Sequence, residues 1–193
     1  MRKSTFHKLN PDKKKRILRA CLKEFSKNSF GEASVSSIVK ELGIAKGSIY
    51  QYFEDKEDLY TYVIERSADR KYEILNFAAQ RAIASWQQWF FQTCLVEIKF
   101  TKEFPEMAQL IRRELFHGNS FLQKKESDFT RTGLTNFQAE LSNAMDMVNL
   151  VFLVSSMKNA IVSRYAGVRL TDKTSMEINT LSEQIARIVT SWS

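Results

Sequence analysis

A group of hydrogen-bond donors lies within one short stretch of this sequence, residues 45–53. It combines a cation, a glycine, hydroxyl groups and a carboxamide, carried by Lys46, Gly47, Ser48, Tyr50, Gln51 and Tyr52. Ile49 and Phe53 are four positions apart, so on a helix both would point into the core and leave the polar side chains facing solvent, with Tyr50 at the boundary. These donors suit phosphate oxygens and base edges, and a glycine lets another backbone approach closely. We therefore interpret the stretch as a candidate nucleic-acid-binding helix.

Two predicted helices would hold this stretch in place. The first begins at Asn10, a good N-cap that is followed by a proline, and it ends near Asn28. The second begins at Ser34 and stops at Gly43, and its inward residues are Val35, Ile38, Val39 and Leu42. A helix, a glycine turn and a second helix anchored from behind have the spacing of a helix-turn-helix. The same spacing is common in proteins that never touch DNA, so by itself it leaves both readings open.

The positive charge of the chain is concentrated in the same region. Residues 1–53 contain 12 Lys and Arg against 4 Asp and Glu, a balance of +8, whereas residues 54–193 contain 17 against 18, a balance of −1. An anionic partner, either nucleic acid or a membrane surface, should therefore meet the N-terminal part. We favour duplex DNA, because the core already needs the apolar face of the first helix, with Leu18, Leu22 and Phe25, and that face is not free to enter lipid.

A resemblance to the TetR family of bacterial transcriptional regulators covers residues 10 to about 60 and is seen in residues 34–60, which read SVSSIVKELGIAKGSIYQYFEDKEDLY. The most specific positions are Gly43, Lys46, Gly47, Ile49, Tyr50, Tyr52, Phe53, Lys56 and Leu59. The resemblance implies a recognition helix in the major groove and DNA contacts by Ser34, Ser36, Ser37, Lys46, Gly47, Ser48, Tyr50, Gln51, Tyr52 and Lys56. The chain departs from the family's pattern at Ala45, where relatives often carry a hydroxyl, and at Val39 and Leu42, where alanines are common.

By this resemblance the chain is expected to be a DNA-binding transcriptional regulator and not an enzyme. Members of the family are typically homodimers that occupy a palindromic operator and release it when a small molecule binds their C-terminal domain. We expect a ligand-responsive repressor with a small apolar or aromatic inducer. A TetR-like protein that binds DNA for an architectural task, without a ligand, is the alternative that the sequence leaves open.

The rest of the sequence predicts further helices. With 6 glycines and 2 prolines in 193 residues, the composition favours an all-α fold of about nine helices. We expect a helix-turn-helix domain over residues 1–54 and a helical ligand-binding and dimerisation domain over residues 55–193. The periodicity predicts helices in the second domain over residues 55–77, 81–103, 105–117, 121–141, 145–165 and 172–192. The helix over 81–103 is apolar on most sides, which is typical of a buried central helix.

Two sets of apolar residues in the second domain are candidates for binding. Stripes on the last two helices suit a dimer interface, which the resemblance favours over a role confined to the core of one chain: Leu150, Val154, Met157, Ile161, Ile178, Leu181, Ile185, Ile188 and Trp192. A set of aromatic residues could line a ligand cavity or simply fill the core: Trp86, Trp89, Phe90, Phe100, Phe116 and Phe121.

Other classes of function find less support. Glu114 and His117 have the E-x-x-H spacing of half a di-iron site, but the only other histidine is His7, which precedes the first predicted helix. We therefore expect no catalytic residues, no metal and no cofactor. Cys21 and Cys94 lie in apolar surroundings and are read as small core residues.

The sequence shows no segment that suits a membrane. No apolar region follows the basic N-terminus, so no signal peptide is predicted. The most apolar run, residues 147–154, is too short to span a bilayer. We expect a cytoplasmic protein with no membrane partner.

Overall fold

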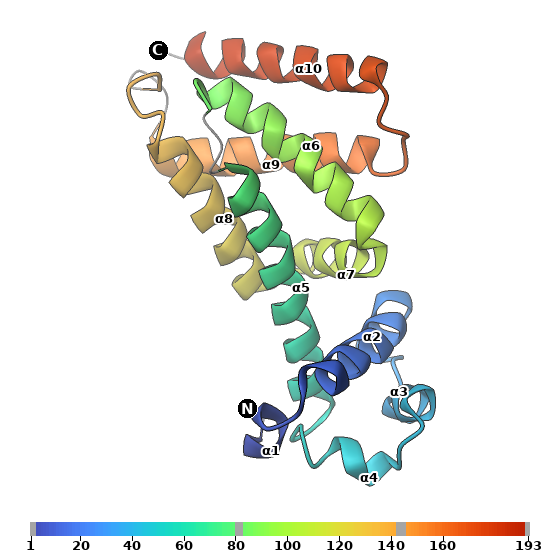
Figure 1. Cartoon of the computed structure of the whole chain (residues 1–193). Coiled ribbons are helices and arrows are strands. Elements are labelled where there is room, and N and C mark those ends of the chain that lie inside the picture. The colour runs from blue at the N-terminus through green and yellow to red at the C-terminus, as the bar shows by residue number, and fades with distance from the viewer. Residues whose placement is uncertain (1–2, 80–82, 142–145, 192–193) are drawn as a thin grey trace. The chain divides into compact units, whose positions relative to one another are not determined.

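The computed structural model describes residues 3–79, 83–141 and 146–191. Within these ranges the chain forms helices and no strands (Figure 1), so the predicted all-α fold is confirmed. The helices are α1 (Ser4–His7), α2 (Pro11–Lys27), α3 (Val35–Leu42), α4 (Lys46–Ile49), α5 (Lys56–Ala79), α6 (Trp86–Glu103), α7 (Pro105–Phe116), α8 (Ser120–Thr135), α9 (Met147–Tyr165) and α10 (Asp172–Ser191). None of these helices is both long and apolar enough to cross a membrane.

The chain divides into two compact units. The N-terminal unit comprises the chain up to Asp69 together with Glu106–Glu114, and the C-terminal unit comprises Arg70–Pro105 together with the chain from Leu115 onward. Helices α5 and α7 each contribute to both units. The N-terminal unit therefore contains most of α7, a helix from much later in the sequence. The predicted functional boundary between residues 54 and 55 stays a prediction.

Local signals fix the ends of α2 and α3. Asn10 caps α2 by accepting a hydrogen bond from the backbone N–H of Lys13 at 2.8 Å, and Ser34 caps α3 in the same way from Ser37 at 3.4 Å. Helix α3 ends at Gly43, whose φ of 68° lies in the left-handed region that favours glycine. The two predicted caps and the predicted glycine stop are therefore confirmed.

The predicted recognition helix is shorter than expected. Helix α4 covers only Lys46–Ile49, and residues 50–52 continue as a turn. The carbonyl of Ile49 accepts the N–H groups of both Tyr52, at 3.0 Å, and Phe53, at 3.1 Å, which tightens the chain where the helix would otherwise continue. Ile49 and Phe53 still reach the core, because both are fully buried.

Helix α1 is an element that the sequence did not predict. It forms at residues 4–7, ahead of the helix expected to be the first. Its one buried side chain, Phe6, is 4% exposed and packs on Phe53 and Tyr62. A single aromatic residue in a basic tail has no periodicity, so no helical pattern was visible there.

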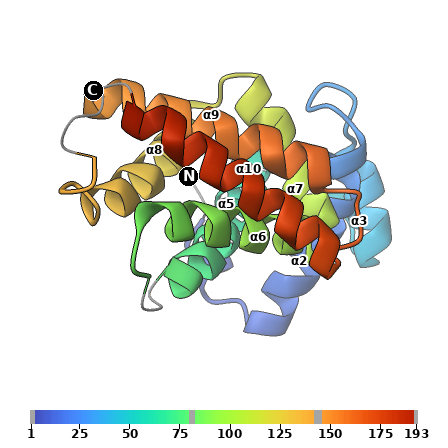
Figure 2. The ribbon, with the colours of Figure 1, turned by 90° about the horizontal axis from the view of Figure 1, so that it is seen from above.

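The C-terminal unit is built around α6. Helix α6 packs against both α9 and α10, and α8 packs against α6 and α9. Figure 2 looks down on α10, with α6 and α9 beneath it. The buried residues of α6 include large aromatic side chains from several turns: Trp86, Trp89, Phe90 and Phe100. The prediction of a central helix in this region is confirmed.

A glycine lets α8 approach α6 closely. A Cβ atom at Gly133 would lie 2.1 Å from Cζ2 of Trp89, so a larger residue would clash with the indole. The Trp89 ring also stacks on Phe129, with 5.8 Å between the ring centroids. The indole is thereby fixed between two helices.

Several helix ends differ from those predicted. Helix α6 begins at Trp86 and not at residue 81, because Ser85 accepts a hydrogen bond from the backbone N–H of Gln88 at 3.3 Å and caps it. Helix α8 ends at Thr135, and residues 136–141 form turns. Asparagine follows Thr135, and its side chain competes for backbone hydrogen bonds in a helix interior, which favours an end at this point.

Candidate DNA-binding surface

Residues 46–53 comprise α4 and the turn after it, and this α4 segment has a buried side and an accessible side. Ile49 and Phe53 anchor it in the core of the N-terminal unit. The accessible side carries five of the predicted DNA-contacting residues. Lys46, Gly47 and Gln51 are exposed, and Ser48 and Tyr50 are half-buried. One short segment thus presents an ammonium group, a bare backbone, two hydroxyl groups and a carboxamide to solvent.

Gly47 leaves open space on this side. No heavy atom of the chain lies within 4 Å of the position that a Cβ atom would occupy there, and the φ of Gly47 is not in the left-handed region. Neither internal packing nor backbone conformation therefore requires a glycine at this position. The absence of a side chain instead leaves the backbone open to a partner from outside.

Tyr52 lies in a different setting from the other five residues. It is 9% exposed, and its hydroxyl accepts a hydrogen bond from Nζ of Lys13 at 2.9 Å. The same ammonium group lies 5.1 Å from the centroid of the Tyr52 ring. Tyr52 therefore joins α2 to the segment after α4, a contact that periodicity could not reveal because it depends on the turn at residues 50–52.

The remaining predicted contacts lie on α3 and at the start of α5. Ser36 and Ser37 are exposed in the first turn of α3, next to the capping Ser34. Lys56 is held in place because its Nζ donates to the carbonyl of Gly31 at 3.3 Å and lies 4.7 Å from the ring centroid of Phe30.

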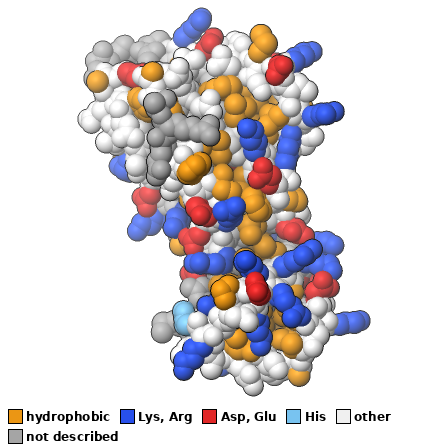
Figure 3. Space-filling view, viewed as in Figure 1, with side chains coloured by type: hydrophobic (Ala, Val, Ile, Leu, Met, Phe, Trp, Pro, Cys, Tyr) orange, Lys and Arg blue, Asp and Glu red, His pale blue; other side chains and the backbone are white. Residues whose placement is uncertain are grey.

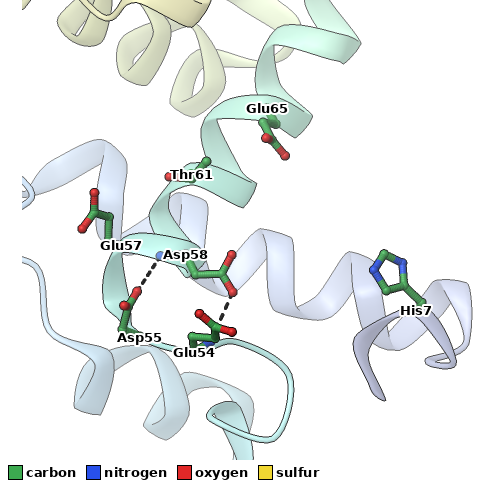
Figure 4. Close-up of a pocket in the computed structure, with 7 residues that line it drawn as sticks. All are labelled: His7, Glu54, Asp55, Glu57, Asp58, Thr61 and Glu65. Carbon is green, nitrogen blue, oxygen red and sulfur yellow. Dashed lines mark hydrogen bonds between the residues drawn. The ribbon is translucent and has the colours of Figure 1, made fainter. Parts of the chain in front are cut away.

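The N-terminal unit carries positive and negative side chains in different places. Lysine and arginine side chains gather on the visible face of the N-terminal unit (Figure 3). A hollow of about 580 Å³ lies at the beginning of α5. Most of its lining side chains are carboxylates (Figure 4), and the full lining is His7, Glu54, Asp55, Glu57, Asp58, Thr61 and Glu65. The N–H of Asp58 donates to the carboxylate of Asp55 at 2.8 Å, and the N–H of Glu54 donates to that of Asp58 at 3.2 Å, so both carboxylates bond backbone groups at the start of α5. These carboxylates suit the positive end of a helix dipole and repel phosphate, so the hollow is not part of the candidate surface.

An arginine from α7 closes the C-terminal end of α2. Arg113 donates to the carbonyl of Phe25 at 2.6 Å and to that of Asn28 at 3.0 Å. It also donates to the hydroxyl of Tyr60 at 3.2 Å, and that hydroxyl donates to Glu114. Burial and the hydrogen bond to Glu114 raise the pKa of Tyr60 to about 12, against the opposing effect of Arg113. Sequence analysis missed this contact, because helical periodicity does not show which distant helix end an arginine reaches.

Four charged side chains are buried together in the C-terminal unit, and we call them the charged quartet: Lys71, Glu97, Glu126 and Lys158. Each lysine pairs with both glutamates, and none of the four is more than 5% exposed. The hydroxyl of Tyr72 donates to Glu126 at 2.7 Å. Burial alone would raise the pKa of Glu126, but the two ammonium groups outweigh it and hold this pKa well below its usual range. Glu97 lies between Val96 and Ile98 in a helix that is apolar on most sides, which is the sequence signal that could have pointed to this group.

The aromatic residues predicted to line a ligand cavity lie in two settings. Phe116 is 88% exposed and Phe121 is 37% exposed. The other four are at most 2% exposed and pack in the core: Trp86, Trp89, Phe90 and Phe100. A hollow of about 500 Å³ along α8 and α9 is lined by a different set, which includes Leu115, Gln123, Glu126, Phe152 and Ser156. The residues that would contact a ligand stay a prediction.

The residues predicted to form a dimer interface are divided in a similar way. Four are buried within the single chain: Leu150, Val154, Ile161 and Ile178. Met157, Leu181 and Ile185 are half-buried, Ile188 is 42% exposed, and Trp192 lies outside the described residues. Exposed apolar side chains that sequence analysis did not single out also lie on α9 and α10: Val148, Phe152 and Met176. Their exposure reflects the turn of each helix, which a list of apolar positions does not show.

The described residues offer no metal site and no accessible thiol. Among the residues that the structure describes, no group of three or more His, Cys, Asp and Glu side chains could hold a metal ion. Cys21 and Cys94 are fully buried, as predicted, and burial raises the pKa of both thiols.

Comparison with known proteins supports the DNA-binding reading of the N-terminal unit. Residues 17–63 match the family of bacterial regulatory proteins described as the tetR family. An HTH-type transcriptional regulator of Staphylococcus aureus (strain USA300) is 40% identical over 58 residues, which make up 30% of this chain and 31% of the relative. The match thus spans less than a third of the curated relative. The resemblance predicted from the sequence is confirmed, and the matched residues include α3, Gly43 and α4.

Solved structures match over nearly the whole chain. A TetR family transcriptional regulator from Chloroflexus aurantiacus J-10-FL has a TM-score of 0.72 at 21% identity, covering 99% of this chain and 97% of the other. The transcriptional regulator FadR from Bacillus subtilis, solved in complex with stearoyl-CoA, has a TM-score of 0.69 at 17% identity, covering 93% and 99%. At these identities the matches establish the fold, with an N-terminal helix-turn-helix and a helical C-terminal domain.

Proposed function

We propose that this chain, with its TetR-type helix-turn-helix, regulates transcription as a ligand-responsive repressor that binds a palindromic operator as a homodimer. The observation that carries the proposal is the accessible side of α4, where Gly47 leaves the backbone open among donor side chains. This segment lies within the residues that match the TetR family.

The donors of the α4 segment have distinct roles in this proposal. Lys46 neutralises a phosphate, and the open backbone at Gly47 allows the duplex to approach. Gln51 reads a base edge, because a carboxamide can both donate and accept hydrogen bonds. Ser34, Ser36 or Ser37 and Lys56 add backbone contacts on either side and fix the register.

Dimerisation would place two such segments on one operator. The exposed apolar side chains of α9 and α10, among them Phe152, 74% exposed, and Met176, 70% exposed, support an interface on these helices. A symmetric dimer matches a palindrome whose half-sites are about one helical turn apart, roughly 34–36 Å.

A small molecule would act through the C-terminal unit. The complex of B. subtilis FadR with stearoyl-CoA supports a ligand that is at least partly apolar. The hollow along α8 and α9 combines apolar and polar side chains and is a candidate site. Leu115 lines this hollow and directly follows Arg113 and Glu114 in the chain. Arg113 donates to Phe25 of α2, and Glu114 accepts from Tyr60, so a ligand that shifts Leu115 would also displace these two contacts.

Selection of random duplex DNA by the purified protein tests the proposal. An enriched palindrome at moderate salt is the expected result. Retention without sequence preference would instead support an architectural role. No retention, even after the protein has been unfolded and refolded to remove any bound ligand, would overturn DNA binding.

Single substitutions then test the assigned roles on the selected operator. Lys46→Ala and Lys56→Ala should each weaken binding and reduce the slope of log affinity against log salt by about one unit per lost phosphate contact in each protomer. Gln51→Ala should relax the base preference at one position of each half-site. An unchanged salt slope in both lysine variants, or an unchanged selected site for Gln51→Ala, would contradict those roles.

A further inference from the structure

The N-terminal segment contacts the end of the α4 segment through three successive carbonyl groups. The backbone N–H of Lys3 donates to the carbonyl of Tyr52 at 3.0 Å, and its Nζ donates to that of Tyr50 at 2.7 Å. The hydroxyl of Thr5 donates to the carbonyl of Gln51, which lies between them. Two residues of the N-terminal segment thus supply donors to every carbonyl of the turn after α4.

These carbonyls lie in the turn directly after α4, where no further helical turn supplies backbone N–H donors to them. The last carbonyls of any helix lack partners within the helix, and α4 has only four residues. A helix this short has almost no stability of its own in water. Its position, and that of Tyr50 and Gln51 behind it, must come from contacts with the rest of the unit.

Phe6 anchors the N-terminal segment against the same part of the unit. Its ring centroid lies 5.0 Å from that of Phe53 and 4.9 Å from that of Tyr62. Lys14 adds a second attachment, because its Nζ donates to the carbonyl of His7 at 3.0 Å. The donors of Lys3 and Thr5 are therefore held in place, and they do not depend on a freely moving tail.

We propose that residues 3–6 are a positioning element for DNA recognition, which holds the turn after α4 so that Gln51 meets its base edge. This inference rests on the proposed function, and it adds residues outside the segment that matches the TetR family. Thr5 is the central residue, because its hydroxyl binds the carbonyl of Gln51 itself. The element acts through the conformation of α4 and needs no contact with DNA.

The substitution Thr5→Val tests this role, because it removes the hydroxyl while keeping the shape and charge of the side chain. Loss of one hydrogen bond predicts operator affinity lower by roughly 3- to 10-fold. The discrimination at the position read by Gln51 should fall as well, while the salt slope stays unchanged, since no phosphate contact is lost. Thr5→Ser should restore both, and Ser4→Ala, an exposed neighbour in α1, is the matched control.

Amide hydrogen exchange of the DNA-free protein gives a second readout. Thr5→Val and Phe6→Ala should both speed exchange at residues 51–53 without a comparable change in the core of α2. Unchanged exchange there, together with unchanged operator affinity in a folded variant, would overturn the proposal. A lower salt slope for Lys3→Gln with no effect of Thr5→Val would also overturn it, because the segment would then touch DNA directly. If the parent protein retains no DNA, the proposed function fails, and the exchange measurement still decides whether residues 3–6 hold α4.

Discussion

Nζ of Lys13 donates a hydrogen bond to the hydroxyl of Tyr52 at 2.9 Å and lies 5.1 Å from the centroid of its ring. This pair links α2 to the turn after α4, so it gives Tyr52 a structural partner within the chain. In a double-mutant cycle of Tyr52→Phe and Lys13→Met, we expect a coupling free energy of about 0.5–1.5 kcal/mol in urea unfolding. A coupling of zero would show that the pair is not formed in solution. If Tyr52→Phe still weakens operator binding in the Lys13→Met background, the hydroxyl contacts DNA in its own right.

Gly47→Ala separates folding from DNA binding. The added methyl group meets no atom of the chain, and alanine loses less backbone entropy on folding, so stability should rise by about 0.4–1 kcal/mol. Operator affinity should fall, because the methyl group occupies the space through which the duplex approaches. Thermal unfolding and a DNA titration of the same sample check both effects. Affinity equal to that of the parent would mean that the backbone at Gly47 does not lie against DNA.

Arg113→Met should destabilise the N-terminal unit. The substitution keeps much of the side-chain volume but leaves the carbonyls of Phe25 and Asn28 without their donor, which predicts a loss of about 1.5–3 kcal/mol. Arg112→Met, at an exposed neighbouring position, is the matched control and should change stability little. Urea unfolding followed by circular dichroism measures the difference. Equal effects of the two substitutions would contradict the assigned role of Arg113.

Removing one charge from the charged quartet should lower the free energy of unfolding more than removing one lysine and one glutamate together. Lys158→Met leaves Glu97 and Glu126 with one lysine between them, so a loss of about 3–5 kcal/mol is expected. The double variant Lys158→Met with Glu126→Leu keeps one opposite pair and should recover much of this loss. Chemical unfolding of both variants checks the order, and a double variant less stable than the single one would contradict it.

The raised pKa of Tyr60 predicts a dependence on alkaline pH. The phenol titrates near pH 10 in the unfolded chain and at about 12 in the folded one, so its contribution to stability is complete below pH 10 and is lost as the pH rises through 12. The stability difference between the parent and Tyr60→Phe should therefore shrink over this range. Unfolding in urea at several pH values measures that difference, and a constant difference would place the hydroxyl outside the contact with Glu114.

The sequence was sufficient for features that depend on local chemistry. Asn10, Ser34 and Gly43 mark helix ends through their own side chains or backbone preference, and each was predicted where it was found. Ile49 and Phe53 were predicted to be buried from their spacing alone. Features that depend on one helix meeting another far along the chain were missed.

Arg113 and Thr5 illustrate why. Each donates to a backbone carbonyl, and every residue has one, so the residue types in the sequence do not show which carbonyl is the partner. The charged quartet was missed for a related reason. Its members come from four helices, and the periodicity of each helix does not show how the four are rotated relative to one another. Lys71 and Lys158 read as ordinary surface lysines until their glutamate partners are known.

The placement of Glu106–Glu114 within the N-terminal unit has a consequence for protein engineering. An N-terminal module that is cut after Asp69 would lose Arg113 and leave the carbonyls at the end of α2 and the Tyr60 hydroxyl without this partner. Chimeras that graft this module onto the C-terminal domain of another protein should therefore carry α7 along or rebuild its contacts. The natural unit of exchange is discontinuous in the sequence, and a single crossover point does not transfer it intact.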